Sequence, residues 1–146
     1  MGINVALDGP SGAGKSTIAK AVAKKLEYVY VDTGAMYRSI AYYVISKGAD
    51  LSDPEQIKPF LGEISIKLCY TEAGQRVILN DEDVSYKIRT PEISMGASKV
   101  SAIPEVREFL LELQKNIAKE NNIIMDGRDI GTVVLPNADV KIFLTA

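Results

Sequence analysis

The first third of the chain alternates between short apolar runs and helical periodicity. Residues 3–7 form a short apolar run with β-branched residues and Asn4 inside it, which is typical of a buried strand. The Gly- and Pro-rich residues 8–14 predict a loop, and helical periodicity follows it. A second strand is expected at 28–31 and a second helix at 36–47, closed by Gly48. This succession predicts an α/β fold, a parallel sheet with helices packed on it.

Within the first of these helices, the periodicity predicts an apolar face directed at the sheet. Its members are Ile18, Ala21, Val22 and Leu26. The lysines at 20, 24 and 25 are expected to face water.

Residues 49–90 follow a different pattern. A short helix is expected to start near Pro54. Apolar and polar residues then alternate over 64–69, and less cleanly around 77–79, before an acidic turn. Such short strands predict a small antiparallel sheet inserted into the α/β pattern. We therefore expect a nucleotide-binding core of residues 1–48 and 91–146, with residues 49–90 as an inserted subdomain.

The last third returns to the α/β pattern. Helices are expected at 91–100 and 104–119, and apolar strands at 123–125 and 140–144. The second helix is clearly amphipathic. Its predicted apolar face comprises Ile103, Val106, Phe109, Leu110, Leu113 and Ile117.

Composition narrows the chemistry available to the chain. It has 146 residues, no histidine and one cysteine, Cys69. Histidine bases, histidine metal ligands, intrachain disulfides and multi-cysteine zinc sites are therefore excluded. Any chemistry must come from carboxylates, lysine, arginine, hydroxyls and backbone amides.

The net charge and the short length of the apolar stretches limit which partners the chain is expected to bind. A net charge of −2 does not suit non-specific binding to nucleic acid. No apolar stretch approaches the length of a membrane span, and no signal peptide is visible. We expect a monomeric cytoplasmic protein that binds neither nucleic acid nor membranes.

The loop after the first strand matches the phosphate-binding pattern G-x-x-x-x-G-K-[ST] at every fixed position. Its residues are Gly9, Pro10, Ser11, Gly12, Ala13, Gly14, Lys15 and Ser16. Glycines let successive N–H groups turn toward one phosphate, and the following helix N-terminus favours negative charge. Lys15 would bridge the terminal phosphates and Ser16 would coordinate Mg²⁺. The alternative is a Gly-rich turn that only caps a helix.

A carboxylate follows the apolar strand at 123–125. Ligands of open α/β sheets bind outside the carboxyl ends of the strands, so Asp126 is a candidate ligand of the same Mg²⁺, directly or through water. The alternative is that Asp126 is a turn residue.

Two further groups follow strands at this edge. Thr33, Tyr37 and Arg38 come after the second strand, and Arg128 and Asp129 after Asp126. Two arginines suggest a second anionic group held bidentately, as a phosphate is. Alternatively, Arg38 pairs with a surface carboxylate and Asp129 caps a short helix.

In these segments and three others, the chain resembles the bacterial cytidylate kinases, a family of phosphate-loop nucleoside monophosphate kinases. The two most specific segments are Asp32-Thr33-Gly34-Ala35-Met36-Tyr37-Arg38 and Asp126-Gly127-Arg128-Asp129-Ile130-Gly131-Thr132. The others are 7–17, 88–90 and 97–107, in the same order along the chain.

The resemblance implies transfer of the γ-phosphoryl group of ATP to CMP or dCMP, with Mg²⁺. Residues Gly9 to Thr17, including Thr17 itself, would bind ATP, and Lys15, Arg128 and Asp126 would be catalytic. Residues 49–90 would be the monophosphate-binding insert. The CMP site would comprise Thr33, Tyr37, Arg38, Ser98, Arg107, Arg128 and Asp129, with Ser98 and Arg107 contacting cytosine.

Two other functions stay open on the sequence. The chain could be a phosphate-loop kinase for another small acceptor, or a nucleotide-binding module that transfers no phosphate. Kinases of the resembled family continue past residue 144 with an arginine-rich lid, a further strand and covering helices. We therefore expect an incomplete chain whose last strand is uncovered, and very weak CMP phosphorylation by the 15.9 kDa form.

Overall fold

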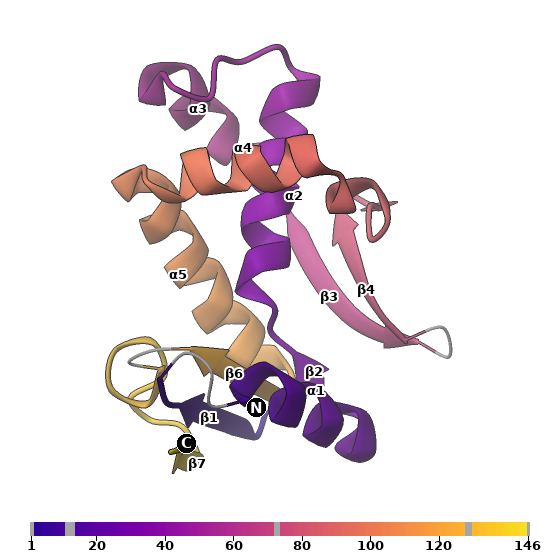
Figure 1. Cartoon of the computed structure of the whole chain (residues 1–146), viewed down its shortest axis with the longest axis vertical. Coiled ribbons are helices and arrows are strands. Elements are labelled where there is room, and N and C mark those ends of the chain that lie inside the picture. The colour runs from indigo at the N-terminus through magenta and orange to yellow at the C-terminus, as the bar shows by residue number, and fades with distance from the viewer. Residues whose placement is uncertain (1, 11–13, 72–73, 128–129, 146) are drawn as a thin grey trace. The chain divides into compact units, whose positions relative to one another are not determined.

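The structure is a computed structural model that describes residues 2–10, 14–71, 74–127 and 130–145. Two compact units are present. The first comprises Met1–Val31, Tyr70–Gln75 and Gln114–Ala146, and the second comprises Asp32–Cys69 and Arg76–Leu113. Figure 1 labels the α-helices and all strands except β5 (Glu82–Asp83).

The first unit contains a four-stranded parallel sheet. Its strands, in spatial order, are β2 (Val29–Tyr30), β6 (Ile123–Gly127), β1 (Asn4–Asp8) and β7 (Val140–Phe143). The register aligns Leu7 with Asp126 and Asp8 with Gly127, so β1 and β6 end side by side. The predicted parallel sheet is confirmed, with its strand bounds shifted by one or two residues.

Helix α1 (Lys15–Leu26) packs on this sheet through a face that only partly coincides with the predicted one. Ala19 and Ala23 are its buried residues, and they join Val5, Leu7 and Ile124 in one core cluster. Val22 packs against this cluster as expected, whereas Ile18 and Leu26 are exposed at 41% and 51%. The prediction was wrong at these two residues because the small alanine side chains, which periodicity did not select, lie against the sheet.

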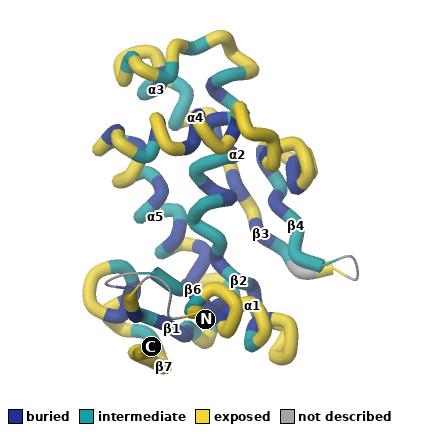
Figure 2. Tube along the Cα trace, in the orientation of Figure 1, coloured by how far each residue is buried: buried dark blue, intermediate teal, exposed yellow. Residues whose placement is uncertain are grey.

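Strand β7 is exposed along its whole length. Val140, Ile142 and Phe143 keep 44%, 46% and 69% of their surface accessible, and Figure 2 shows this strand in yellow. The expectation of an uncovered last strand therefore holds for the structure as it stands.

The second unit is built around α2 (Thr33–Ser46) and α4 (Pro91–Ser101). Met36, Ile40 and Val44 of α2 are fully buried. A Cβ on Gly96 of α4 would lie 3.2 Å from the Ala41 Cβ, so the two helices meet closely at that glycine. Asp32 caps α2 by accepting from the Ala35 N–H at 3.1 Å, and Gly48, with φ 76°, follows its end.

The second unit also contains three short elements: α3 (Pro54–Leu61), β5 (Glu82–Asp83) and η1 (Lys87–Arg89). Strands β3 (Ile66–Thr71) and β4 (Gly74–Leu79) form a three-stranded sheet with β5, and β4 pairs antiparallel with β5. The predicted small antiparallel sheet is confirmed. Helix α5 (Pro104–Glu120) and strands β3 and β4 each have residues in both units.

The predicted apolar face of the long helix is largely confirmed. Val106, Leu110 and Ile117 of α5 are buried, and Phe109 and Leu113 are partly buried. Among the described residues, none of the helices combines the length and apolar character that crossing a membrane requires.

Candidate functional site

The loop that follows β1 carries the phosphate-binding pattern. Of its residues, Gly9, Pro10, Gly14, Lys15 and Ser16 are described, whereas Ser11, Gly12 and Ala13 lie outside the described residues. Gly9 and Gly14 have φ of 153° and 82°. A Cβ on Gly9 would lie 2.4 Å from the Leu144 carbonyl oxygen, so only glycine fits at the exit of β1.

Lys15 occupies the first turn of α1 and folds back over the loop. Its Nζ donates to the carbonyl oxygens of Gly9 at 2.7 Å and Pro10 at 3.1 Å. Both contacts are to neutral acceptors, so a phosphate oxygen is a stronger partner for this ammonium. Ser16 and Thr17 follow it, exposed at the helix N-terminus where backbone N–H groups favour an anion.

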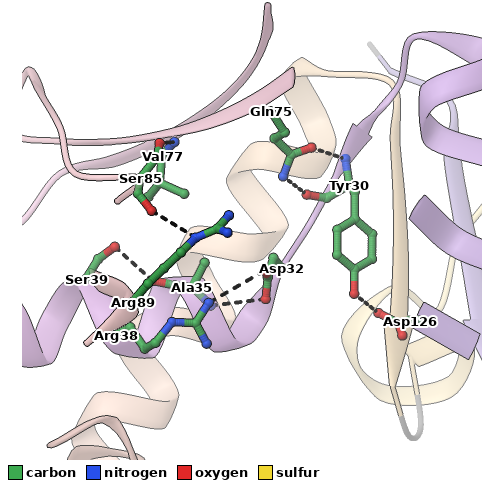
Figure 3. Close-up of polar contacts among 10 residues, drawn as sticks. All are labelled: Tyr30, Asp32, Ala35, Arg38, Ser39, Gln75, Val77, Ser85, Arg89 and Asp126. Atoms are coloured by element: carbon green, nitrogen blue, oxygen red, sulfur yellow. Dashed lines mark hydrogen bonds and ion pairs between the residues drawn. The ribbon is translucent and has the colours of Figure 1, made fainter. Parts of the chain in front are cut away.

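Asp126 lies at the carboxyl end of β6, directly beside the end of β1. Its register partner is Leu7, two residues before Gly9. Its Oδ1 accepts a hydrogen bond from the Tyr30 hydroxyl at 2.7 Å (Figure 3). A carboxylate therefore stands beside the strand that leads into the loop with the phosphate-binding pattern, and its role as a magnesium ligand stays a prediction.

Asp8 is a residue that the sequence analysis did not single out. Its Oδ1 accepts from the Ile130 N–H at 2.7 Å and its Oδ2 from the Gly131 N–H at 2.9 Å. These are the first residues of η2 (Ile130–Val134), a single π-helical turn. Asp8, the last residue of β1, thus holds the segment after β6 through two hydrogen bonds. Arg128 and Asp129, which precede Ile130, lie outside the described residues.

Replacing Asp8 with alanine is expected to destabilise the protein by about 1–3 kcal/mol, because two partly buried N–H groups lose their acceptor. Urea unfolding measures the change. Asp139→Ala is the matched control, since that carboxylate accepts one exposed N–H, from Asn4. Equal losses in the two variants would contradict this account of Asp8.

The second unit contains a pocket of about 240 Å³ between α2 and α4. Three predicted site residues line it: Tyr37, Arg38 and Ser98. Gly34, Ser94, Ala97 and Ser101 complete the lining. Thr33 is the first residue of α2, next to Gly34. The sequence analysis missed Ser94 and Ser101, although their spacing from Ser98 places all three serines on one face of a helix.

Arg38 gives this pocket its charge. Its Nη2 lies 3.9 Å from Asp32 Oδ2, a distant ion pair (Figure 3). Its Nε is buried and has no hydrogen-bond partner among the described residues. A buried guanidinium nitrogen without an acceptor is costly, so an anionic ligand would satisfy it. The alternative expectation, that Arg38 pairs with a carboxylate, is met by Asp32, and this ion pair leaves the Nε without a partner among the described residues.

Arg107, on α5, acts on the same pocket from its exposed position. Burial raises the pKa of the Tyr37 phenol, and the Arg107 guanidinium offsets part of that rise. Arg107 is not among the residues that line the pocket. The lining itself comprises one arginine, one phenol and three serine hydroxyls among its residues.

Magnesium was expected at Ser16 and Asp126. Within the described part of the chain, no group of three or more His, Cys, Asp or Glu side chains could hold a metal ion. Mg²⁺ at nucleotide sites commonly takes only one or two protein ligands and fills the rest with phosphates and water. Ser16 and Asp126 would supply one hydroxyl and one carboxylate, a number of protein ligands within that range, and the site stays a prediction.

Comparisons with known proteins show which family the chain is similar to. The family model described as "Cytidylate kinase" matches residues 5–146. The chain is 51% identical over 144 residues to a cytidylate kinase of Carboxydothermus hydrogenoformans, covering 99% of this chain and 65% of that protein.

Two further relatives are matched over nearly the same share of their length. A cytidylate kinase of Caldicellulosiruptor saccharolyticus is 53% identical over 144 residues, and one of an Exiguobacterium species is 49% identical over the same length. Each alignment covers 99% of this chain and 64% of the relative. The chain thus spans slightly less than two thirds of the length of these relatives.

Proposed function

The chain belongs to the cytidylate kinase family, and from that premise we propose that it serves the transfer of the γ-phosphoryl group of ATP to CMP or dCMP. The observation that carries the proposal is the pocket of the second unit. It combines the buried Arg38 Nε, which has no partner in the described part of the chain, with serine and tyrosine hydroxyls, the groups that bind a phosphate and a polar base.

ATP binds, in this proposal, at Gly9–Thr17, including Ser11, Gly12 and Ala13. Lys15 exchanges its contacts with the Gly9 and Pro10 carbonyls for phosphate oxygens of the donor. Ser16 and Asp126 hold Mg²⁺, which neutralises charge on the phosphates when bound. The loop N–H groups and the N-terminus of α1 hold the remaining phosphate charge.

CMP binds in the proposed scheme through Thr33, Tyr37 and Arg38 at the monophosphate and through Ser98 and Arg107 at the base. Arg128 and Asp129 complete the acceptor site, with Arg128 on the phosphate. The attacking group is a phosphate oxygen that is already ionised, so the reaction requires no strong general base. A chain without histidine is suited to such a reaction.

An acceptor panel tests the proposal. Purified protein is incubated with ATP, Mg²⁺ and CMP, dCMP, UMP, AMP or shikimate, and acceptor-dependent ADP formation is measured. CMP and dCMP are expected to give the highest rates. Dominant turnover of another acceptor would assign a different kinase, and ATP binding without any acceptor-dependent ADP would indicate a non-catalytic module.

Base selection is tested at Arg107. Arg107→Ala is expected to lower the preference for CMP over UMP by about tenfold, the effect of one hydrogen bond to a charged group. The preference is measured as the ratio of kcat/KM values. Glu108→Ala, an exposed neighbour on the same helix, is the control. An unchanged ratio in Arg107→Ala would remove this residue from base recognition.

A further inference from the structure

Tyr30 reaches from the edge strand of the sheet to the candidate metal ligand. It pairs in register with Ile124 on β6, and Asp126 lies two residues further along the same strand. Alternate residues of a strand share a face, so Tyr30 and Asp126 lie on the same side of the sheet. The hydroxyl donates to Asp126 Oδ1 at 2.7 Å, across 96 residues of sequence.

This hydrogen bond orients the carboxylate. A short bond to one oxygen restricts rotation of the group and leaves the other oxygen as the available acceptor. Among the described residues, Asp126 Oδ2 has no hydrogen bond or ion pair. Hydrogen bonds of this kind to a ligating carboxylate typically change metal affinity by 10- to 100-fold.

Tyr30 is itself held by a side chain. Its N–H donates to Gln75 Oε1 at 2.7 Å, and Gln75 Nε2 donates to the Tyr30 carbonyl. The amide of Gln75 thus replaces the peptide group that a neighbouring strand would present to this edge strand (Figure 3). On the ring itself, Lys20 Nζ of α1 lies 5.7 Å from the centroid. Backbone and ring are both fixed, which points the hydroxyl at Asp126.

We propose that Tyr30 is a positioning residue for the divalent cation of bound ATP, and that Gln75 holds Tyr30 in place for this task. The hydroxyl fixes Asp126 through Oδ1 and keeps Oδ2 available to Mg²⁺. The inference rests on the proposed function, because it takes ATP with Mg²⁺ as the ligand and Asp126 as the residue that meets the metal.

The test measures nucleotide binding and needs no turnover. Calorimetry gives the dissociation constant of ATP in the presence of Mg²⁺ and, separately, in EDTA. The constant in EDTA divided by the constant with Mg²⁺ gives a ratio, which reports how strongly the protein holds the metal once ATP is present. Tyr30→Phe is expected to reduce this ratio by about tenfold, the low end of the range for such partners. Its affinity for metal-free ATP should stay unchanged.

Two variants separate positioning from structural damage. Tyr30→Phe retains the ring and its contact with Lys20, and Tyr28→Phe removes a hydroxyl from a tyrosine packed against the same core cluster. Tyr28→Phe should leave the ratio at the wild-type value. Gln75→Met keeps the side-chain length but loses both backbone contacts, so it should reduce the ratio in the same direction as Tyr30→Phe.

A double-mutant cycle localises the effect to Asp126. Asp126→Asn is expected to remove most of the Mg²⁺ dependence. Adding Tyr30→Phe to that variant should have no further effect, because the hydroxyl acts only through the carboxylate.

The outcomes distinguish this inference from the function on which it rests. A wild-type ratio that responds to Mg²⁺ and is the same in Tyr30→Phe would overturn the inference alone. Equal weakening of both forms of ATP in Tyr30→Phe would also overturn it, since that result reports structural damage. A wild-type protein indifferent to Mg²⁺ would contradict the inference together with the metal site of the proposed function, whereas the acceptor panel tests cytidylate transfer independently.

Discussion

Lys15→Ala is expected to lower kcat/KM for CMP phosphorylation by at least about 100- to 1000-fold, the effect of removing one preorganised charge from a transition state. The side chain is the cation that the loop itself holds, through Gly9 and Pro10. Phosphoryl transfer depends on placed charges more than on proton transfer, so removal of this ammonium should slow it strongly. Acceptor-dependent ADP formation measures the loss.

The control for Lys15 lies on the same helix. Lys25 occupies the last turn of α1 and is exposed, so Lys25→Ala should leave the rate near the wild-type value. Circular dichroism of both variants verifies that α1 is intact. An active Lys15→Ala variant with wild-type kinetics would refute the phosphate-loop mechanism.

Arg38→Ala is expected to have the second largest effect, a fall of about 10- to 100-fold in CMP affinity. The buried Nε has no acceptor among the described residues, and a hydrogen bond to a charged group contributes about 1.5–3 kcal/mol. Arg38→Lys should recover only part of the affinity, because an ammonium cannot make the paired contacts of a guanidinium. CMP binding is followed by calorimetry.

Two measurements keep this prediction specific. ATP affinity should be unchanged in Arg38→Ala, since the residue lies in the other unit from the phosphate-binding loop. Lys47→Ala, an exposed cation at the far end of α2, should bind CMP as the wild-type protein does. Wild-type CMP affinity in Arg38→Ala would show that this pocket does not hold the acceptor phosphate.

Local rules account for the parts of the fold that the sequence predicted well. Asp32 caps α2, and Gly48 follows its end with a positive φ, because capping depends on residues within one turn. The alternation around Ile66 and Leu68 predicted half-buried strands for the same reason. Element bounds differ by a few residues, as at α2, which begins at Thr33 and not at Met36.

The error on α1 shows where local rules stop. Periodicity grouped Ile18, Val22 and Leu26 on one face, but only Val22 of these packs against the core cluster. The buried residues of the helix are Ala19 and Ala23, whose small side chains carry little apolar signal in the sequence. A helix surface alone does not record which of its faces the rest of the chain will cover.

The candidate site divides in the same way. The sequence alone predicts the chemical groups of the candidate site: a loop with the phosphate-binding pattern and Lys15, a carboxylate after a buried strand, and arginines in a chain without histidine. The loop is recognisable because a phosphate cradle is made by consecutive backbone N–H groups.

Which distant groups meet depends on the tertiary structure. The order β2-β6-β1-β7 places Tyr30 beside Asp126, and Asp8 reaches Ile130 across 122 residues of sequence. Likewise, Arg38 lines a pocket between α2 and α4, and its buried Nε has no acceptor among the described residues. Hydrogen-bond partners that lie far apart along the chain depend on strand order and helix packing, and these are set by burial of the whole core, which no short segment specifies.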